Sequence, residues 1–284
     1  MFTGKTKNLG IIGWPVAHSF SPAMQNAALQ KAGLDFVYVA MPVEPADLEP
    51  AVNGLRSLNF RGVNVTIPHK TAIIPLLDEV TEDAQMIGAV NTVVNDHGRL
   101  RGYNTDVQGF MKALTATGFS AEGLNVAVLG AGGAARAALW GLIKAKAQRV
   151  YLGVRNPGRA ELLVKDFRAK GEVKAYDWLS DEWQDYLSKA ELIINTTPLG
   201  MAPKSDAMPP VNWEKVRPGA FVYDVIYTPA KTRFLQEAEA RKHPILNGEA
   251  MLVQQGAASF RLWTGETPDT DLMRKVLREA LQNK

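Results

Sequence analysis

Two short polar segments and a glycine-rich motif carry the residues of this chain that are most able to do chemistry. The first segment, Asn64-Val65-Thr66-Ile67-Pro68-His69-Lys70, and the second, Asn104-Thr105-Asp106, each end in a side chain that can donate or accept a proton. The motif follows them at Gly130-Ala131-Gly132-Gly133-Ala134-Ala135 and has the spacing of a dinucleotide-binding fingerprint. This order predicts a substrate domain first, a cofactor domain second, and a cleft between them in which the chemistry takes place.

Each small residue of the fingerprint has a physical role. Gly130 permits a tight turn, Gly132 lets the backbone approach a pyrophosphate, and Ala135 keeps the following helix close to the sheet. The N-terminus of that helix offers free N–H groups and partial positive charge to phosphates. Small residues also serve plain packing of a helix on a sheet, but here the motif follows an apolar strand at 125–129 and opens an Ala-rich helix. This context favours dinucleotide binding.

The next strand indicates which dinucleotide. NAD-binding proteins usually place Asp or Glu at the end of that strand, where it bonds the ribose 2′-hydroxyl. The segment after the expected strand at 149–154 has no acid and instead carries Arg155 and Arg159, whose guanidinium groups can clamp a 2′-phosphate. The alternative is that both arginines are ordinary solvated residues at a helix start. We predict NADP.

Strands and helices alternate along the chain and must position these residues. Strands are expected at 8–13, 36–40 and 63–66, helices at 21–33, 45–58, 68–77 and 81–87, and a hairpin at 91–95 and 100–104 that adds antiparallel edge strands. A helix from Thr105 to about 117 follows, then strands at 125–129, 149–154, 192–195 and 221–224 and a helix at 248–263. The pattern predicts an α/β protein: a substrate domain with a mainly parallel sheet over residues 1–106, a Rossmann domain over 107–242, and C-terminal helices over 243–284 that pack back on the first domain.

Composition excludes several classes of function. No run of about 18 apolar residues exists, so we expect no membrane span and a cytoplasmic protein. The chain has no cysteine, and its four histidines lack metal-ligand spacing, so we expect no metal site. The net charge of +3 comes without a basic block, which argues against nucleic-acid binding. The expected partner is a small-molecule substrate, and the expected state is a monomer or homodimer.

Read together, the motifs resemble the shikimate dehydrogenase family. The resemblance covers nearly the whole chain in order, and it departs from the family pattern at Gln25, Val154 and Val225, where His, Asn and Met are common. The segments that carry it are 13–22 (GWPVAHSFSP), 64–70 (NVTIPHK), 89–92 (AVNT), 104–106 (NTD), 223–227 (YDVIY) and 247–255 (NGEAMLVQQ).

The resemblance implies an oxidoreductase that reduces 3-dehydroshikimate to shikimate with NADPH, in the chorismate route to the aromatic amino acids. It implies that Lys70 and Asp106 are the acid/base pair beside the reacting oxygen, and that Ser19 and Ser21 hold the substrate carboxylate. The other substrate ligands it implies are Thr66, Asn91, Asn104, Tyr227 and Gln255. The expected cofactor-binding residues are Gly130, Ala131, Gly132, Gly133, Ala134, Arg155, Arg159, Thr196, Val225 and Gly248.

Each residue taken alone also has a plainer interpretation. Ser21 can be only a helix N-cap, Asp106 only a first-turn acid and Lys70 only a surface lysine. The helical phase does not separate Gln255 from Gln254, and only the family pattern prefers Gln255. Two other functions stay open: a quinate or quinate/shikimate dehydrogenase that uses NAD or NADP, and a non-catalytic NADP-binding sensor that has kept the fold.

Overall fold

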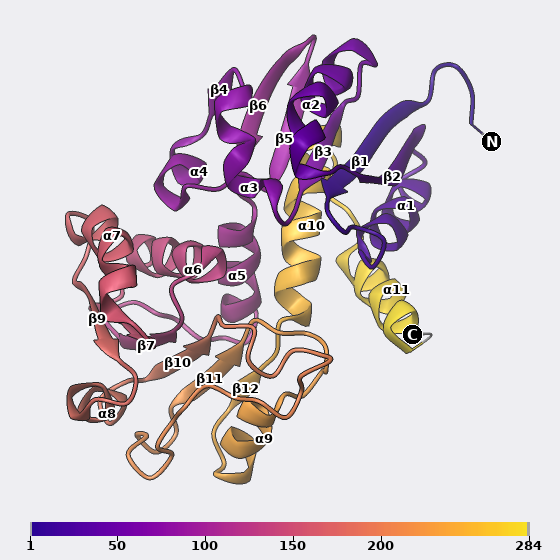
Figure 1. Ribbon diagram of the computed structural model, residues 1–284. Coiled ribbons are helices and arrows are strands. Elements are labelled where there is room, and N and C mark those ends of the chain that lie inside the picture. Colours follow the sequence, from indigo (N-terminus) through magenta and orange to yellow (C-terminus); the bar gives the residue numbers. More distant parts are fainter. Residues whose placement is uncertain (1, 283–284) are drawn as a thin grey trace. The chain divides into compact units, whose positions relative to one another are not determined.

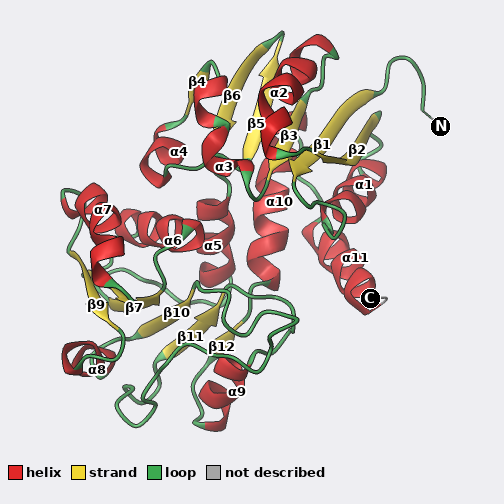
Figure 2. Cartoon of the chain, viewed as in Figure 1, coloured by secondary structure: helices red, strands yellow, loops and turns green. Residues whose placement is uncertain are grey.

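The chain folds into two α/β units, each built around a six-stranded sheet. The computed structural model, shown in Figure 1, describes residues 2–282. Unit 1 contains the residues up to Gly109 and those from Val253 onward, and unit 2 runs from Phe110 to Leu252. Both passages of the chain between the units fall inside helices, α5 (Asp106–Thr115) and α10 (Glu249–Thr264). Strands and helices alternate through both units (Figure 2), which confirms the predicted α/β class.

The sheet of unit 1 has the strand order β2-β1-β3-β5-β6-β4. Strands β1, β2 and β3 are parallel, whereas β5 runs antiparallel to both β3 and β6. The predicted hairpin is therefore present, but its expected position at the edge is wrong, because the two-residue strand β4 pairs in parallel beyond β6. The bounds are β1 (Lys7–Gly13), β2 (Phe36–Pro42), β3 (Gly62–Val65), β4 (Glu79–Val80), β5 (Thr92–Asp96) and β6 (Arg99–Tyr103).

Helices of unit 1 join distant parts of the chain. Helix α1 (Ser21–Lys31) and helix α11 (Thr270–Gln282) come from opposite ends of the sequence and lie side by side (Figure 1). Helix α2 (Leu48–Ser57) follows the 3-10 turn η1 (Pro45–Asp47), and α4 (Glu82–Ile87) precedes the hairpin. The single helix expected over 68–77 is wrong: Pro75 has no N–H to donate, so α3 (His69–Ala72) ends and a 3-10 turn, η2 (Ile74–Leu76), follows.

The sheet of unit 2 is wholly parallel, with the order β12-β11-β10-β7-β8-β9. This is the doubly wound Rossmann order, and it confirms the predicted fold of the second half. The order reverses between β7 and β10, and ligands of such sheets bind at the carboxyl ends of the strands there. The bounds are β7 (Asn125–Leu129), β8 (Arg149–Val154), β9 (Val173–Asp177), β10 (Leu192–Asn195), β11 (Phe221–Asp224), β12 (Ile245–Leu246), α6 (Gly133–Lys144), α7 (Pro157–Arg168), α8 (Asp181–Leu187) and α9 (Arg233–Ala240).

Both faces of this second sheet are covered, which explains its nearly continuous apolar strands. Val222 of β11 packs in a cluster with Trp183 of α8 and Phe234 of α9. Tyr223, the next residue, points to the other face and stacks on Phe110 of α5 with ring centroids 5.1 Å apart. Packing on both faces of the sheet therefore fixes the positions of the carboxyl ends of β7, β10 and β11.

Two kinds of feature are not found over residues 2–282. No helix there combines the length and the apolar composition that crossing a membrane requires. No group of three or more His, Asp or Glu side chains there is arranged to hold a metal ion.

Candidate active site

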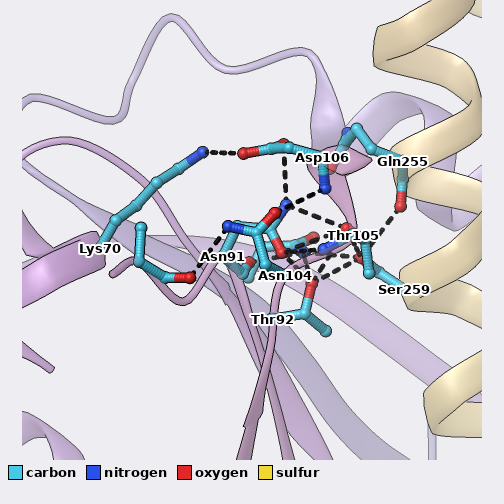
Figure 3. Close-up of polar contacts among 10 residues, drawn as sticks. Lys70, Asn91, Thr92, Asn104, Thr105, Asp106, Gln255 and Ser259 are labelled. Carbon is cyan, nitrogen blue, oxygen red and sulfur yellow. Dashed lines mark hydrogen bonds and ion pairs between the residues drawn. The ribbon is translucent and has the colours of Figure 1, made fainter. Parts of the chain in front are cut away.

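An ion pair between Lys70 and Asp106 is the chemical centre of unit 1. Lys70 lies on α3 and Asp106 is the first residue of α5, and the Nζ–Oδ2 distance is 2.7 Å (Figure 3). The two side chains are 32% and 18% exposed, so a small molecule can reach them while much of the surrounding water is excluded. The neighbouring His69 is buried, and its Nε2 lies 2.8 Å from the carbonyl oxygen of Val43, which anchors the short helix that carries Lys70.

Two buried asparagines bond Asp106, one at its carboxylate and one at its backbone N–H. The Nδ2 of Asn91 donates to Asp106 Oδ1 at 2.9 Å and to Thr105 Oγ1 at 2.9 Å. The Oδ1 of Asn104 accepts the backbone N–H of Asp106 at 3.0 Å, while its Nδ2 donates to the carbonyl oxygen of Ala89 at 2.9 Å. Both asparagines therefore act on Asp106, a role that the sequence did not indicate.

A layer of buried hydroxyl groups lies against this pair of asparagines. Ser259 of α10 is fully buried, and its Oγ lies 2.8 Å from Thr92 Oγ1 and 3.2 Å from Thr105 Oγ1 (Figure 3). It also accepts from Asn64 Nδ2 at 3.0 Å and donates to the carbonyl oxygen of Gln255 at 3.1 Å. The network joins the turn of α10 that contains Gln255 to the residues that adjoin Asn91 and Asp106.

Sequence reasoning missed Ser259, Thr92 and Asn64 as members of this network. The available signal was a polar side chain within an apolar run, such as Asn64 between Val63 and Val65 on a buried strand. Gln25, where the family pattern commonly has His, is also buried, and its Nε2 donates to the carbonyl oxygen of Gly256 at 3.0 Å. Helix α10 is thus also bonded to α1.

The two serines and Thr66 lie at the same edge of the sheet as Lys70, because β1 and β3 are parallel and both end there. Ser19 Oγ accepts the backbone N–H of Ser21 at 3.3 Å. The alternative role of Ser21 as an N-cap is wrong, because Phe20 occupies that position and Ser21 is the first helical residue. A Cβ on Gly13 would lie 2.4 Å from Thr66 Cγ2, so glycine is required for this close approach.

A cavity of about 570 Å³ lies in unit 2 at the carboxyl ends of the strands, a size typical of small-molecule sites. Gly130 has a φ of +111°, and a Cβ there would lie 2.8 Å from Thr196 Oγ1, so only glycine fits this turn comfortably. Of the expected cofactor residues, those that line the cavity are Gly130, Ala131, Gly132, Arg155, Arg159 and Thr196. Trp178, Thr197, Pro198 and Leu199 also line it and were not predicted.

The remaining expected cofactor residues lie at element starts and strand ends. Gly133 and Ala134 form the first turn of α6, where unpaired N–H groups and the helix dipole favour an anion. Val225 follows β11, and a Cβ on Gly248 would lie 1.9 Å from the Val225 carbonyl oxygen, so these two backbones touch. Neither of these two residues lines the cavity.

The cavity suits a dinucleotide that bears an extra phosphate. Arg155 and Arg159 are exposed at the end of β8, and among residues 2–282 no acidic side chain lines the cavity. Asn156 Oδ1 accepts the backbone N–H of Arg159 at 3.3 Å and caps α7, which fixes the turn between the two arginines. Two guanidinium groups on one ordered turn can bond a phosphate in a way that an NAD-type carboxylate would oppose.

Tyr227 belongs to unit 2 and lies in the segment after β11. Burial raises the pKa of its hydroxyl above the ordinary value. The hydroxyl therefore stays protonated at neutral pH and can donate a hydrogen bond to a ligand.

The last residue of β11, Asp224, is a fully buried carboxyl group without a cationic partner among the contacts that the structure gives it. Burial raises its pKa to about 6, against hydrogen bonds from the Thr232 hydroxyl, the Ile226 N–H and the Asn195 amide that favour the ionised form. In an unfolded chain the pKa of an aspartate side chain is about 3.9. Folding therefore stabilises the protonated form.

This shift predicts a pH-dependent loss of stability. Between the two pKa values the folded state binds more protons than the unfolded state. The stabilisation of the folded state by protonated Asp224 is therefore fully present below about pH 3.9 and is lost as the pH rises through about 6. Relative to Asp224→Asn, the wild-type protein should lose on the order of 3 kcal/mol over that window. Urea unfolding of both proteins from about pH 4 to pH 7 measures the difference, and parallel pH curves would contradict the prediction.

Family models and an individual relative match this chain. A family model described as the shikimate dehydrogenase substrate binding domain matches residues 11–93, and one described as the shikimate 5'-dehydrogenase C-terminal domain matches residues 248–278. The shikimate dehydrogenase (NADP(+)) of Citrifermentans bemidjiense is 47% identical over 285 residues, with 98% of this chain and 97% of the relative covered.

Solved structures agree over the same length. The shikimate 5-dehydrogenase of Listeria monocytogenes, in complex with shikimate and NAD, superposes with a TM-score of 0.93 at 35% identity and covers 97% of this chain and 98% of its own. The shikimate 5-dehydrogenase of Thermus thermophilus, in complex with NADP(H) and shikimate, superposes with a TM-score of 0.87 at 38% identity and covers 97% of this chain and 100% of its own.

Proposed function

The chain belongs to the shikimate dehydrogenase family, and from this membership we propose that it reduces 3-dehydroshikimate to shikimate with NADPH. The observation that carries the proposal is the Lys70–Asp106 ion pair, 2.7 Å long and partly exposed. A sensor that only bound the dinucleotide would have no need of an ammonium and a carboxylate held together at an accessible position. The enzyme would act in the cytoplasm, as a monomer or homodimer, in the biosynthesis of aromatic amino acids.

The proposed mechanism assigns the proton to Lys70. When bound, the reduced nicotinamide supplies a hydride to the carbonyl carbon of the substrate. The carbonyl oxygen then gains negative charge and needs both a cation and a proton, and the Lys70 ammonium provides both. Asp106 holds the ammonium in place, and Asn91 and Asn104 hold Asp106.

The substrate ligands are proposed from the family pattern. Ser19 and Ser21 would bind the carboxylate, and their position at the start of α1 supports this because the first turn of a helix favours an anion. Hydroxyl groups on the ring would bond to the remaining ligands. These are Thr66, Asn91, Asn104, Tyr227 and Gln255.

The cofactor would be held by the cavity of unit 2. The turn at Gly130–Gly132 and the N-terminus of α6 would take the pyrophosphate, and Arg155 and Arg159 the 2′-phosphate. Val225 and Gly248 would contact the nicotinamide end of the cofactor. In this proposal residues 1–106 with the C-terminal helices bind substrate, and residues 107–242 bind NADP.

The arginines predict the coenzyme preference. Arg155→Ala and Arg159→Ala should each raise the KM for NADPH by about 10-fold, because each removes a charge-assisted hydrogen bond to phosphate, and should leave the KM for NADH nearly unchanged. Steady-state kinetics with both coenzymes measures this. Lys174→Ala, on the exposed side of β9, is a charge-matched control that should leave both values as in the wild type. Equal losses with NADPH and NADH would contradict the assignment.

A direct assay separates the proposed enzyme from its rivals. The absorbance of the reduced nicotinamide is followed with shikimate or quinate as the reductant and with NADP or NAD as the oxidant. Turnover that is fastest with shikimate and NADP supports the proposal. Faster turnover with quinate identifies a quinate dehydrogenase, and NADP binding with no turnover of either substrate identifies a sensor.

A further inference from the structure

Two polar side chains end neighbouring strands of unit 2 and have no part in the proton transfer described above. Asn195 ends β10 and Asp224 ends β11, and the two residues are paired in the register of the parallel strands. Both are fully buried. Asn195 Nδ2 donates to Asp224 Oδ1 at 3.1 Å, so the strand ends are joined by their side chains.

Asp224 also holds the segment that follows its own strand. Its Oδ1 accepts the backbone N–H of Ile226 at 3.0 Å, and its Oδ2 accepts the hydroxyl of Thr232 at 2.6 Å. Thr232 in turn caps α9, since its Oγ1 accepts the backbone N–H of Leu235 at 3.4 Å. The carbonyl oxygen of Ile226 accepts the backbone N–H of Gly248 at 2.9 Å. One carboxylate therefore fixes the segment that contains Val225 and Tyr227.

Asn195 holds the other segment. Its Oδ1 accepts the backbone N–H of Thr197 at 3.0 Å and the Thr197 hydroxyl at 2.7 Å, and its Nδ2 also reaches the carbonyl oxygen of Leu199 at 3.3 Å. Thr196, Thr197, Pro198 and Leu199 all line the dinucleotide cavity. The Asn195–Asp224 contact thus links the cavity wall to the segment after β11.

The chemistry of the Asn195–Asp224 contact indicates a role beyond stabilising the fold. The three groups that bond Asp224 are all neutral donors, so none of them compensates its charge when it is ionised. A buried carboxylate without a cation costs stability, and burial raises the pKa of this one. What the carboxylate does provide is two acceptor oxygens for three donors from three different segments. An amide would keep one acceptor oxygen for Asn195 and Ile226, but it would present a neutral donor to the Thr232 hydroxyl and lose the charge-assisted bond there.

We propose that Asp224 is a positioning residue for cofactor binding, which holds residues 196–199 and 225–227 in the mutual arrangement that NADPH requires. This rests on the proposed function, in which both segments contact the dinucleotide. Loosening Asp224 should therefore weaken the binding of NADPH without unfolding unit 2.

The test measures NADPH affinity and thermal stability of the full-length chain at neutral pH. Asp224→Asn should raise the Kd for NADPH about 10-fold, as expected for the loss of one charge-assisted hydrogen bond, while the Tm is equal to or higher than that of the wild type because the buried charge is gone. Titration of the nicotinamide fluorescence gives the Kd. If Asp224 only stabilised the fold, its substitution would not weaken NADPH binding in a protein whose Tm is equal to or higher than that of the wild type.

A matched pair at Thr232 provides the second measurement, which also decides the case in which Asp224→Asn does not fold. Thr232→Ser keeps the hydroxyl and should bind NADPH within about twofold of the wild type, whereas the isosteric Thr232→Val should weaken binding as Asp224→Asn does. Tyr186→Phe is the control. It removes a buried hydroxyl bonded to the carbonyl oxygens of Val126 and Arg149, away from both segments, and should leave the Kd unchanged.

The outcomes separate this inference from the proposed function. Folded Asp224→Asn and Thr232→Val proteins that both bind NADPH within about twofold of the wild type would overturn the positioning role alone. A wild-type protein that binds no NADPH would overturn the cofactor assignment and this inference with it.

Discussion

Lys70→Met should lower kcat by about 10³-fold and leave the Kd for shikimate within a few-fold of the wild type. The methionine side chain is unbranched like that of lysine and only one heavy atom shorter, so the change removes the proton and the positive charge while most of the space stays filled. Shikimate carries its negative charge on the carboxylate, which we assign to Ser19 and Ser21 and not to Lys70. Steady-state turnover with NADP and calorimetric binding of shikimate measure the two quantities separately.

A matched substitution controls for the lost charge. Lys31→Met removes an exposed lysine at the end of α1 and should retain wild-type turnover. Turnover of Lys70→Met within about tenfold of the wild type would remove Lys70 from the acid role, because general acid catalysis is ordinarily worth more than that. A parallel loss of shikimate binding would instead assign Lys70 to ground-state recognition.

The Rossmann unit was predictable because its signals are local. The fingerprint lies within a few residues of an apolar strand, and the absence of an acid after β8 is visible in the same stretch. The turn at Gly130, with its φ of +111°, has the conformation that the glycine predicts. Local signals fail where an element is too short for periodicity, as at β4 with its two residues, or where one proline divides a helix, as at Pro75.

The candidate active site could be proposed only through the family pattern. Lys70 and Asp106 are 36 positions apart, and nothing in the residues alone pairs them. The resemblance names the chemical groups but not the side chains that hold them. Ser259 and Asn64 are 195 positions apart and meet only because α10 returns to unit 1, so a lone serine in an Ala-rich helix carries no sign of its four contacts.

The passages between the units also lack a local signal. They fall within α5 and α10, both continuous helices, and no glycine- or proline-rich linker marks them in the sequence. Helix α5 begins with Asp106 and continues into unit 2 at Phe110, so the carboxylate that pairs with Lys70 lies on a helix that runs through both units.

Asp106→Asn should lower kcat by about 10²-fold to 10³-fold, although the substitution is isosteric. Asn91 Nδ2 donates to Asp106 Oδ1, so the carbonyl oxygen of the new amide should take that position. The new NH₂ group would then face the Lys70 ammonium, where the carboxylate oxygen now accepts at 2.7 Å. Two donors cannot bond each other, so Lys70 loses its fixed position beside the reacting oxygen.

A double-mutant cycle tests whether the two residues act as one unit. Because Asp106 acts through the lysine that it holds, Lys70→Met combined with Asp106→Asn should be little slower than Lys70→Met alone. Arg56→Lys serves as a control for a substitution in a different ion pair of unit 1, that with Asp78, and should leave kcat unchanged. Losses in kcat that multiply in the double variant would show that Asp106 acts on the substrate independently, and the proton would then need a second route to the carbonyl oxygen.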